Sequence, residues 1–218
     1  MGNGDFGDYP YGLADYGGKL YTLNQGTDQV VELNPTTAAI VNTVSIGLNT
    51  TGEGAMAFNS VGTLFFSRSS GSIGILYSTT LNGSSNVIDS SLDPSMDGMD
   101  FAPNGTLYGI DQTNLGLYTI NPANGDTTLI GPTGIPVDGV AGFAIRQDGA
   151  LFAAVGRSLY SINPSTGAGT LIGVTGYDRI SGLTFLEDGG GGQVPEPSTW
   201  ALMLSGLAGL AFRKLRRK

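Results

Sequence analysis

Residues 120–131 read INPANGDTTLIG, and residues 162–173 read INPSTGAGTLIG. Each string begins at the end of an apolar strand, continues through a Pro-led turn, and ends in a second short strand. The central Gly125 and Gly167 provide the positive φ that a bulge after such a turn requires. Two hairpins of one design, 42 residues apart, predict a repetitive all-β fold.

The same design recurs along most of the chain. Units begin at Gly12, Gly54, Gly98, Gly142 and Gly182, in steps of 42, 44, 44 and 40 residues. In each complete unit, a first apolar strand ends in a Gly-containing turn and three further short strands follow. The second strands are expected at Leu20-Tyr21, Leu64-Phe65, Leu107-Tyr108 and Leu151-Phe152, and the third at Val30-Val31, Leu76-Tyr77, Leu117-Tyr118 and Leu159-Tyr160. A period of about 40–45 residues with four strands per unit is typical of β-propeller blades.

In period and pattern, residues 12–187 resemble the NHL or YVTN-type bacterial β-propellers. The resemblance implies a propeller-like array of about four four-stranded antiparallel blades plus one extra strand, in a domain at residues 12–188. The same hairpins are also compatible with a β-sandwich or a solenoid.

The ends of the repeat region do not match. Four complete units occupy residues 12–181, and residues 182–186 supply only the first strand of a fifth. Residues 1–11, an irregular N-terminal segment, are too few to supply three strands, and they lack the basic and apolar regions of a secretory signal peptide. Both observations favour a sequence without its true N-terminus, and a small, imperfectly closed propeller is the alternative. We expect the strand after Gly182 to be unpartnered or joined irregularly to the first unit.

Composition excludes several classes of function. The chain has no Cys and no His, which excludes disulfides, the usual zinc sites, Cys nucleophiles and His general bases. Residues 1–193 hold five Lys and Arg against 17 Asp and Glu, whereas five of the ten cations lie in the last six residues. An acidic body repels nucleic acid, so nucleic acid is not an expected partner.

The C-terminal region has a separate organisation. The run GGGGQ at 189–193 is a flexible linker, and residues 194–218 read VPEPSTWALMLSGLAGLAFRKLRRK. The apolar stretch from Trp200 to Phe212 has 13 residues, fewer than the ~20 of an ordinary membrane span, so its length alone favours a buried helix. The cations that follow it, and Trp200 at its other end, favour a membrane segment with a cytoplasmic C-terminus.

Residues 194–218 resemble the PEP-CTERM sorting signal almost part for part. The resemblance implies that an exosortase, a membrane peptidase, recognises Pro195, Glu196 and Pro197. It also implies export, transient residence in the inner membrane through a single helix, and delivery to the cell surface or an exopolysaccharide matrix. The implied membrane segment contains Trp200, Leu202, Leu204, Leu207, Leu210 and Phe212. The implied stop-transfer cluster is Arg213, Lys214, Arg216, Arg217 and Lys218.

Acidic residues provide the remaining candidates for chemistry. Asp97 with Asp100, and Glu187 with Asp188, are pairs that a carboxylate mechanism would need, but polar residues are ordinary at blade junctions, and no catalytic residue is assigned. Structural calcium is the one cofactor left open, because carboxylate oxygens are its usual ligands. No calcium motif is present, so no ligand is assigned among the acidic residues near blade junctions: Asp93, Asp97, Asp100, Asp111, Asp138 and Asp178.

The recurrent Tyr and Phe residues are expected to pack between blades rather than to bind a ligand. The sequence therefore predicts an exported, non-catalytic surface or matrix protein that contacts exopolysaccharide or other surface proteins. The alternative is an extracellular propeller enzyme, a lyase or a glycosidase, that acts on polysaccharide. A cleft with two or more converging carboxylates would favour the enzyme, and a featureless acidic surface would favour the scaffold.

Overall fold

A computed structural model describes residues 10–24, 26–48, 54–70, 72–111, 113–138, 141–177 and 179–186. The chain has two compact regions, residues 1–187 and residues 188–218, and all the described residues lie in the first region. Within the described ranges, no helix is long and apolar enough to cross a membrane. The tail helix expected from the sequence falls outside these ranges.

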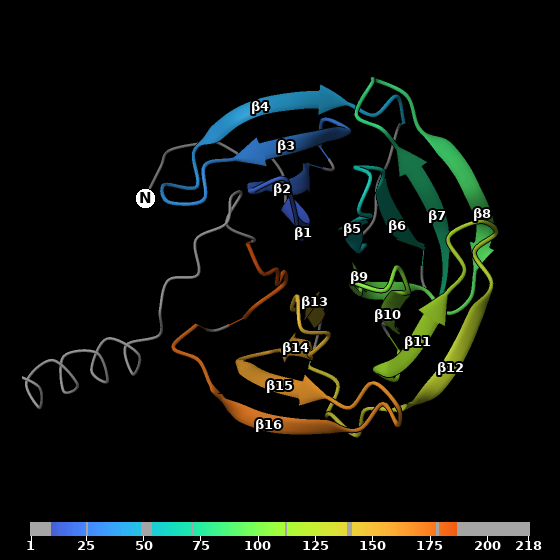
Figure 1. Ribbon diagram of the computed structural model, residues 1–218, viewed down its shortest axis with the longest axis vertical. Helices are drawn as coiled ribbons and strands as arrows, with labels where there is room; N and C mark the ends of the chain where they lie inside the picture. The colour runs from blue at the N-terminus through green and yellow to red at the C-terminus, as the bar shows by residue number, and fades with distance from the viewer. Residues whose placement is uncertain are drawn as a thin grey trace, which may run out of the picture. The chain divides into compact units, whose positions relative to one another are not determined.

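Sixteen strands form four antiparallel sheets, each built from four consecutive strands (Figure 1). The first sheet contains β1 (Pro10–Tyr16), β2 (Lys19–Asn24), β3 (Gln29–Leu33) and β4 (Ile40–Ser45). The second contains β5 (Met56–Phe58), β6 (Leu64–Ser70), β7 (Ile73–Thr79) and β8 (Asn86–Leu92). The third contains β9 (Met96–Phe101), β10 (Leu107–Asp111), β11 (Gly116–Ile120) and β12 (Thr127–Pro132). The fourth contains β13 (Ala141–Ile145), β14 (Leu151–Val155), β15 (Ser158–Ile162) and β16 (Gly169–Val174).

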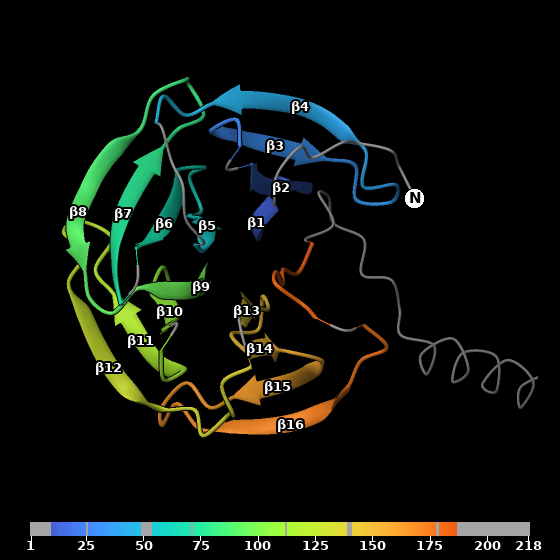
Figure 2. The same ribbon diagram turned by 180° about the vertical axis from the view of Figure 1, so that it is seen from behind.

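The sheets are arranged around a centre like the blades of a propeller, with the first strand of each sheet innermost and the fourth outermost (Figures 1 and 2). Apolar side chains fill each space between consecutive sheets. Leu64, Leu76 and Leu107, for example, are fully buried in these layers. The predicted propeller is therefore confirmed, and a two-layer sandwich is excluded. In each of the four sheets, the second strand and the third strand contain the residue pairs that the repeat predicted for them.

Close packing of the inner strands explains the glycine that begins most units. A Cβ atom on Gly98 would overlap Phe143 of the next blade, and one on Gly142 would lie 3.0 Å from the backbone nitrogen of Leu183. In the second unit, the residue at the position of this glycine is Ala55, one residue after the Gly54 that the repeat predicted. Met56 pairs with Phe66 as Met99 pairs with Gly109, so Ala55, and not Gly54, is the counterpart of Gly98.

Residues 179–186 occupy the innermost position of a fifth unit, between β13 and β1 (Figure 1). A Cβ atom on Gly182 would lie 3.0 Å from Cβ of Leu13, and the Thr184 hydroxyl donates a hydrogen bond of 2.9 Å to Asp15. The Phe185 ring contacts Phe152 edge-on, with 5.2 Å between ring centroids. Among the described residues this segment joins no strand ladder. The expected irregular junction with the first unit is confirmed.

The recurrent Asn-Pro pairs form side-chain-capped turns. The Asn163 side chain accepts hydrogen bonds from the backbone N–H groups of Ser165 and Thr166, and Asn34 accepts the equivalent bonds in the first unit. A residue with positive φ follows, at 81° for Gly125 and 77° for Gly167. The first unit instead places Ala38 there, with φ of 55°.

Replacing Ala38 by Gly is therefore expected to stabilise the protein by about 0.5–1 kcal/mol. The left-handed conformation costs an L-residue roughly 1–2 kcal/mol, and the extra chain entropy of Gly offsets about half of this gain. Urea denaturation of the two proteins tests the prediction. An unchanged or lower midpoint for Ala38→Gly would show that Ala38 is not strained.

Candidate functional site

A depression of about 690 Å³ lies on the face of the propeller formed by the turns that follow the first strands. All five units contribute to it. The lining includes Asp15, Tyr16 and Gly17 of the first unit, Phe58–Val61 and Phe65 of the second, Asp100–Pro103 and Gly105 of the third, Ile145–Gln147 of the fourth, and Phe185 of the fifth. Along the same inner strands, a second space near Met99 and Phe143 measures only about 10 Å³.

Aromatic rings form one wall of the depression. The Tyr16 side chain is 37% exposed, and its ring stacks on Phe58 with centroids 5.2 Å apart and planes inclined by 23°. Tyr21 on β2 of the first blade also packs against the Phe58 ring of the second blade. Gly62, with φ of 83°, lies so close to Tyr16 that a Cβ atom there would be 2.7 Å from the ring. Tyr16 is thus held in place while part of it stays accessible.

Two carboxylates also line the depression, and the fold positions both of them. Asp15 is the last residue but one of the inner strand β1 and accepts the hydrogen bond from the hydroxyl of Thr184. Asp100 on β9 accepts hydrogen bonds from the N–H of Phe101 at 2.8 Å and of Ile145 at 2.7 Å. The second bond joins the third blade to the fourth. Asp100 therefore has a structural role at the edge of the site.

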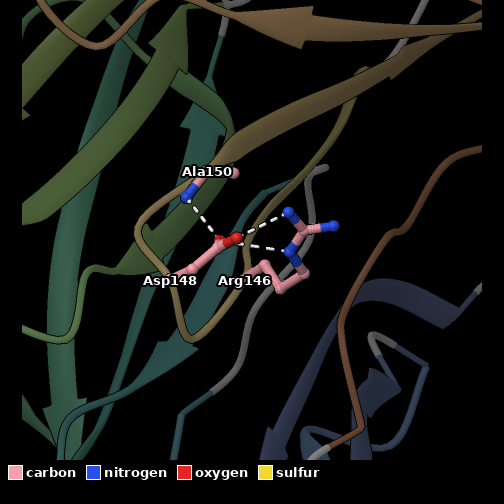
Figure 3. A network of polar contacts seen from close by, with 3 residues as sticks. All are labelled: Arg146, Asp148 and Ala150. Atoms are coloured by element: carbon pink, nitrogen blue, oxygen red, sulfur yellow. Dashed lines mark hydrogen bonds and ion pairs between the residues drawn. The ribbon is translucent and has the colours of Figure 1, made fainter. Parts of the chain in front are cut away.

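The cation of the depression is Arg146, in the turn between β13 and β14 (Figure 3). Its Nε and Nη2 donate to the two carboxylate oxygens of Asp148 at 3.1 and 2.6 Å, and its guanidinium lies over Phe152, 5.4 Å from the ring centroid. Hydrogen bonds from Arg146 and from the N–H of Ala150 lower the pKa of Asp148. Because the pKa of Asp148 is lowered in the folded protein, the ion pair between Arg146 and Asp148 is fully formed above the ordinary carboxyl pKa. The pair is lost as the pH falls through the lowered pKa of Asp148.

Of the two acidic pairs suggested by sequence, the structure describes Asp97 and Asp100, and these two do not converge on one site. Asp97 is 3% exposed and accepts a hydrogen bond from the N–H of Ala141, whereas Asp100 lines the depression. Both carboxylates bond to β13, but the N–H groups that they accept from, those of Ala141 and Ile145, are four positions apart on that strand, so the two side chains lie at separate points along it. Glu187 and Asp188 lie outside the described residues.

The acidic residues near blade junctions, to which the sequence assigned no calcium, do not form a cluster where the structure describes them. Asp111 is fully buried, and its carboxylate accepts hydrogen bonds from the N–H groups of Thr113, Asn114 and Gly116 in the turn before β11. Asp93 and Asp138 are exposed, and Asp178 lies outside the described residues. Among the residues that the structure describes, no three acidic side chains are close enough to hold a metal ion.

The residues assigned to the sorting tail all fall outside the described ranges. They are the motif Pro195, Glu196 and Pro197, the apolar residues Trp200, Leu202, Leu204, Leu207, Leu210 and Phe212, and the basic residues Arg213, Lys214, Arg216, Arg217 and Lys218. Their roles stay predictions.

Apart from Asp100, sequence reasoning did not identify the residues that line the depression. As expected, the rings of Tyr16, Phe101 and Phe185 each contact an aromatic ring of a neighbouring blade. What was not expected is that these three residues also line the depression. The overlooked signal is position, because these three residues lie at or next to the end of a first strand, where the chain turns. Arg146 and Asn59 occupy equivalent turn positions.

Comparisons with protein families identify two regions of the chain. Residues 193–218 match the PEP-CTERM protein-sorting motif, and residues 95–184 match a domain of unknown function (DUF4394). The chain thus has a β-propeller body followed in sequence by a PEP-CTERM sorting domain. No curated protein matches the chain.

Solved structures similar to the body are propeller proteins of differing function. A gluconolactonase from Xanthomonas campestris is 15% identical, with a TM-score of 0.58 over 81% of this chain and 65% of its own. A structure of the nidogen/laminin complex is 13% identical, with a TM-score of 0.57 over 81% and 68%. Hydrazine synthase of Kuenenia stuttgartiensis is 15% identical, with a TM-score of 0.51 over 75% and 49%. The chain thus spans about half to two thirds of the length of these proteins, and such low identities show the fold alone.

Proposed function

We propose that this chain is an exported, non-catalytic binding protein that an exosortase sorts to the cell surface or the exopolysaccharide matrix. Its propeller body binds polysaccharide in the depression, on the face formed by the turns that follow the first strands. The sorting motif at residues 193–218 supports the route, and the aromatic wall of the depression supports the ligand.

The tail supplies the route to the surface. In this proposal the exosortase reads Pro195, Glu196 and Pro197 outside the hydrocarbon region of the inner membrane. The apolar stretch from Trp200 to Phe212 spans the membrane, and the five terminal cations keep the C-terminus in the cytoplasm.

The depression has the properties of a carbohydrate site. It is concave and within the usual ~300–1,000 Å³ of small-molecule sites. The accessible Tyr16 ring offers a flat surface for the C–H face of a sugar, while Asn59, Gln147 and Asp15 offer polar atoms for hydroxyl groups. These features together favour binding of a polysaccharide chain over docking of a flat protein surface.

An enzyme is the alternative, and one observation favours it: Asp15 and Asp100 line the same depression. A glycosidase needs one carboxyl group to donate a proton and another to act as a base or a nucleophile. Here the Asp100 carboxylate accepts hydrogen bonds from two backbone N–H groups, and one of these bonds holds the third blade against the fourth, so this carboxylate is already engaged in a structural contact. The absence of His from the sequence removes the commonest other acid. The binding role is therefore the better supported.

Replacing Tyr16 by Ala is expected to weaken polysaccharide binding about tenfold, which corresponds to about 1.4 kcal/mol. Tyr16→Phe keeps the ring and should retain most of the affinity. Tyr177→Ala is the matched control, since Tyr177 is 72% exposed and lies outside the depression. Binding is measured by co-sedimentation of the full-length chain with exopolysaccharide extracted from the producing bacterium. Equal binding by Tyr16→Ala and the parent would contradict the proposed site.

A further inference from the structure

We infer that the sugar bound in the depression carries amino groups, so that the ligand is a cationic oligosaccharide of the glucosamine type. This inference rests on the proposed function and names the chemical class of its ligand. It follows from the charges at the depression, the exposed aromatic ring and the size of the space.

The charged groups give the depression a negative character. Asp15 and Asp100 line it, and its lining cation, Arg146, is bound by both carboxylate oxygens of Asp148. These residues amount to three formal negative charges against one positive charge. The sequence over residues 1–193 is acidic as well, with five cations against 17 acidic residues. Such a field attracts cations and repels uronates and other anionic sugars.

The aromatic wall favours the same kind of ligand. A cation is attracted to the face of an aromatic ring within about 6 Å of its centroid. Tyr16, which keeps part of its surface accessible, and Phe101 line the same depression as Asp15 and Asp100. A protonated amino sugar satisfies both features at once, because its ammonium group meets the carboxylate and ring while its C–H face stacks on Tyr16.

A bare metal ion does not fit these observations. Among the described residues no three acidic side chains converge, and a space of about 690 Å³ is far larger than one ion fills. The volume suits several linked sugar units. The cation that the depression selects is therefore organic and extended.

The test is isothermal titration calorimetry on the full-length chain in detergent micelles. The ligands are a short chitosan oligomer, a chitin oligomer of equal length whose amines are acetylated, and an oligogalacturonate. We expect the chitosan oligomer to bind at least about tenfold more tightly than the chitin oligomer, and the oligogalacturonate to bind most weakly. Binding of chitosan should weaken with added salt and as pH rises through the pKa of the sugar amine.

Single charge changes should then shift affinity in opposite directions. Asp15→Asn keeps an oxygen that can accept the bond from Thr184, and should weaken chitosan binding about tenfold. Arg146→Gln removes the cation and should tighten it. Asp138→Asn is the control, since Asp138 is exposed and lies outside the depression. It should leave the affinity unchanged.

Equal or tighter binding of the chitin oligomer would overturn the inference, as would an Asp15→Asn variant that binds chitosan like the parent. Either result would leave a neutral-sugar site and the proposed function intact. Oligolysine binding with the same affinity and the same dependence on Asp15 would also overturn it, because sugar structure would then be irrelevant. If no oligosaccharide bound and Tyr16→Ala changed nothing, the proposed function would fail together with the inference.

Discussion

Replacing Asp111 by Ala is expected to lower the free energy of unfolding by about 3 kcal/mol. The fully buried carboxylate of Asp111 accepts hydrogen bonds from three backbone N–H groups, those of Thr113, Asn114 and Gly116. Ala would leave these donors without their acceptor in a turn next to the fully buried Leu115. Urea denaturation of the full-length chain, followed by circular dichroism, measures the loss.

The same experiment tests whether Asp111 is a calcium ligand. The loss should be equal with calcium and with a chelator, because the carboxylate is bound by backbone donors. Asp126→Ala is a suitable control, since Asp126 is an exposed turn residue that bonds to the Asn124 side chain. A loss for Asp111→Ala that appears only in the presence of calcium would identify Asp111 as a metal ligand instead.

Two tail variants are expected to fail at different steps of sorting. Replacing Pro195, Glu196 and Pro197 by Ala should give a protein that stays in the membrane unprocessed, because the peptidase no longer finds its motif. Replacing Arg213, Lys214, Arg216, Arg217 and Lys218 by neutral residues should loosen membrane retention, since each cation contributes roughly 1 kcal/mol near an anionic surface.

Both variants should be expressed behind a secretory signal peptide in a host that has an exosortase. Cell fractionation locates the protein, and mass spectrometry of its C-terminus shows whether it was processed. The parent chain is the control for both. Processing and surface delivery of both variants like the parent would exclude the sorting role of the tail.

The propeller could be predicted from the sequence because apolar strand positions, turn residues and glycines all recur with the same period. Leu64, Leu107 and Leu151 begin the second strands of three units and are all buried. The Asn-Pro turns and glycine positions recur with them. Departures at single positions were harder to predict. Ala55 stands where other units have Gly, and only the strand register shows the one-residue shift.

The candidate site could not be predicted, because it forms from one short piece of each unit. Tyr16 and Phe185 are far apart in the chain and line the same depression only because residues 179–186 lie beside β1. Spacing also misleads at short range. Asp97 and Asp100 look like a pair in sequence, but each carboxylate accepts a hydrogen bond from a different part of β13, Asp97 from Ala141 and Asp100 from Ile145. Local patterns therefore identify strands and turns, whereas a site between blades requires the assembled ring.

We propose that the body binds polysaccharide and does not cleave it. The most direct test incubates the full-length chain with exopolysaccharide from the producing bacterium and measures two quantities, the bound fraction and the chain length of the polysaccharide by size-exclusion chromatography. We predict that the protein co-sediments with the polysaccharide and that the chain-length distribution stays unchanged. Shortening of the polysaccharide that disappears in an Asp15→Asn variant would contradict this account and identify an enzyme.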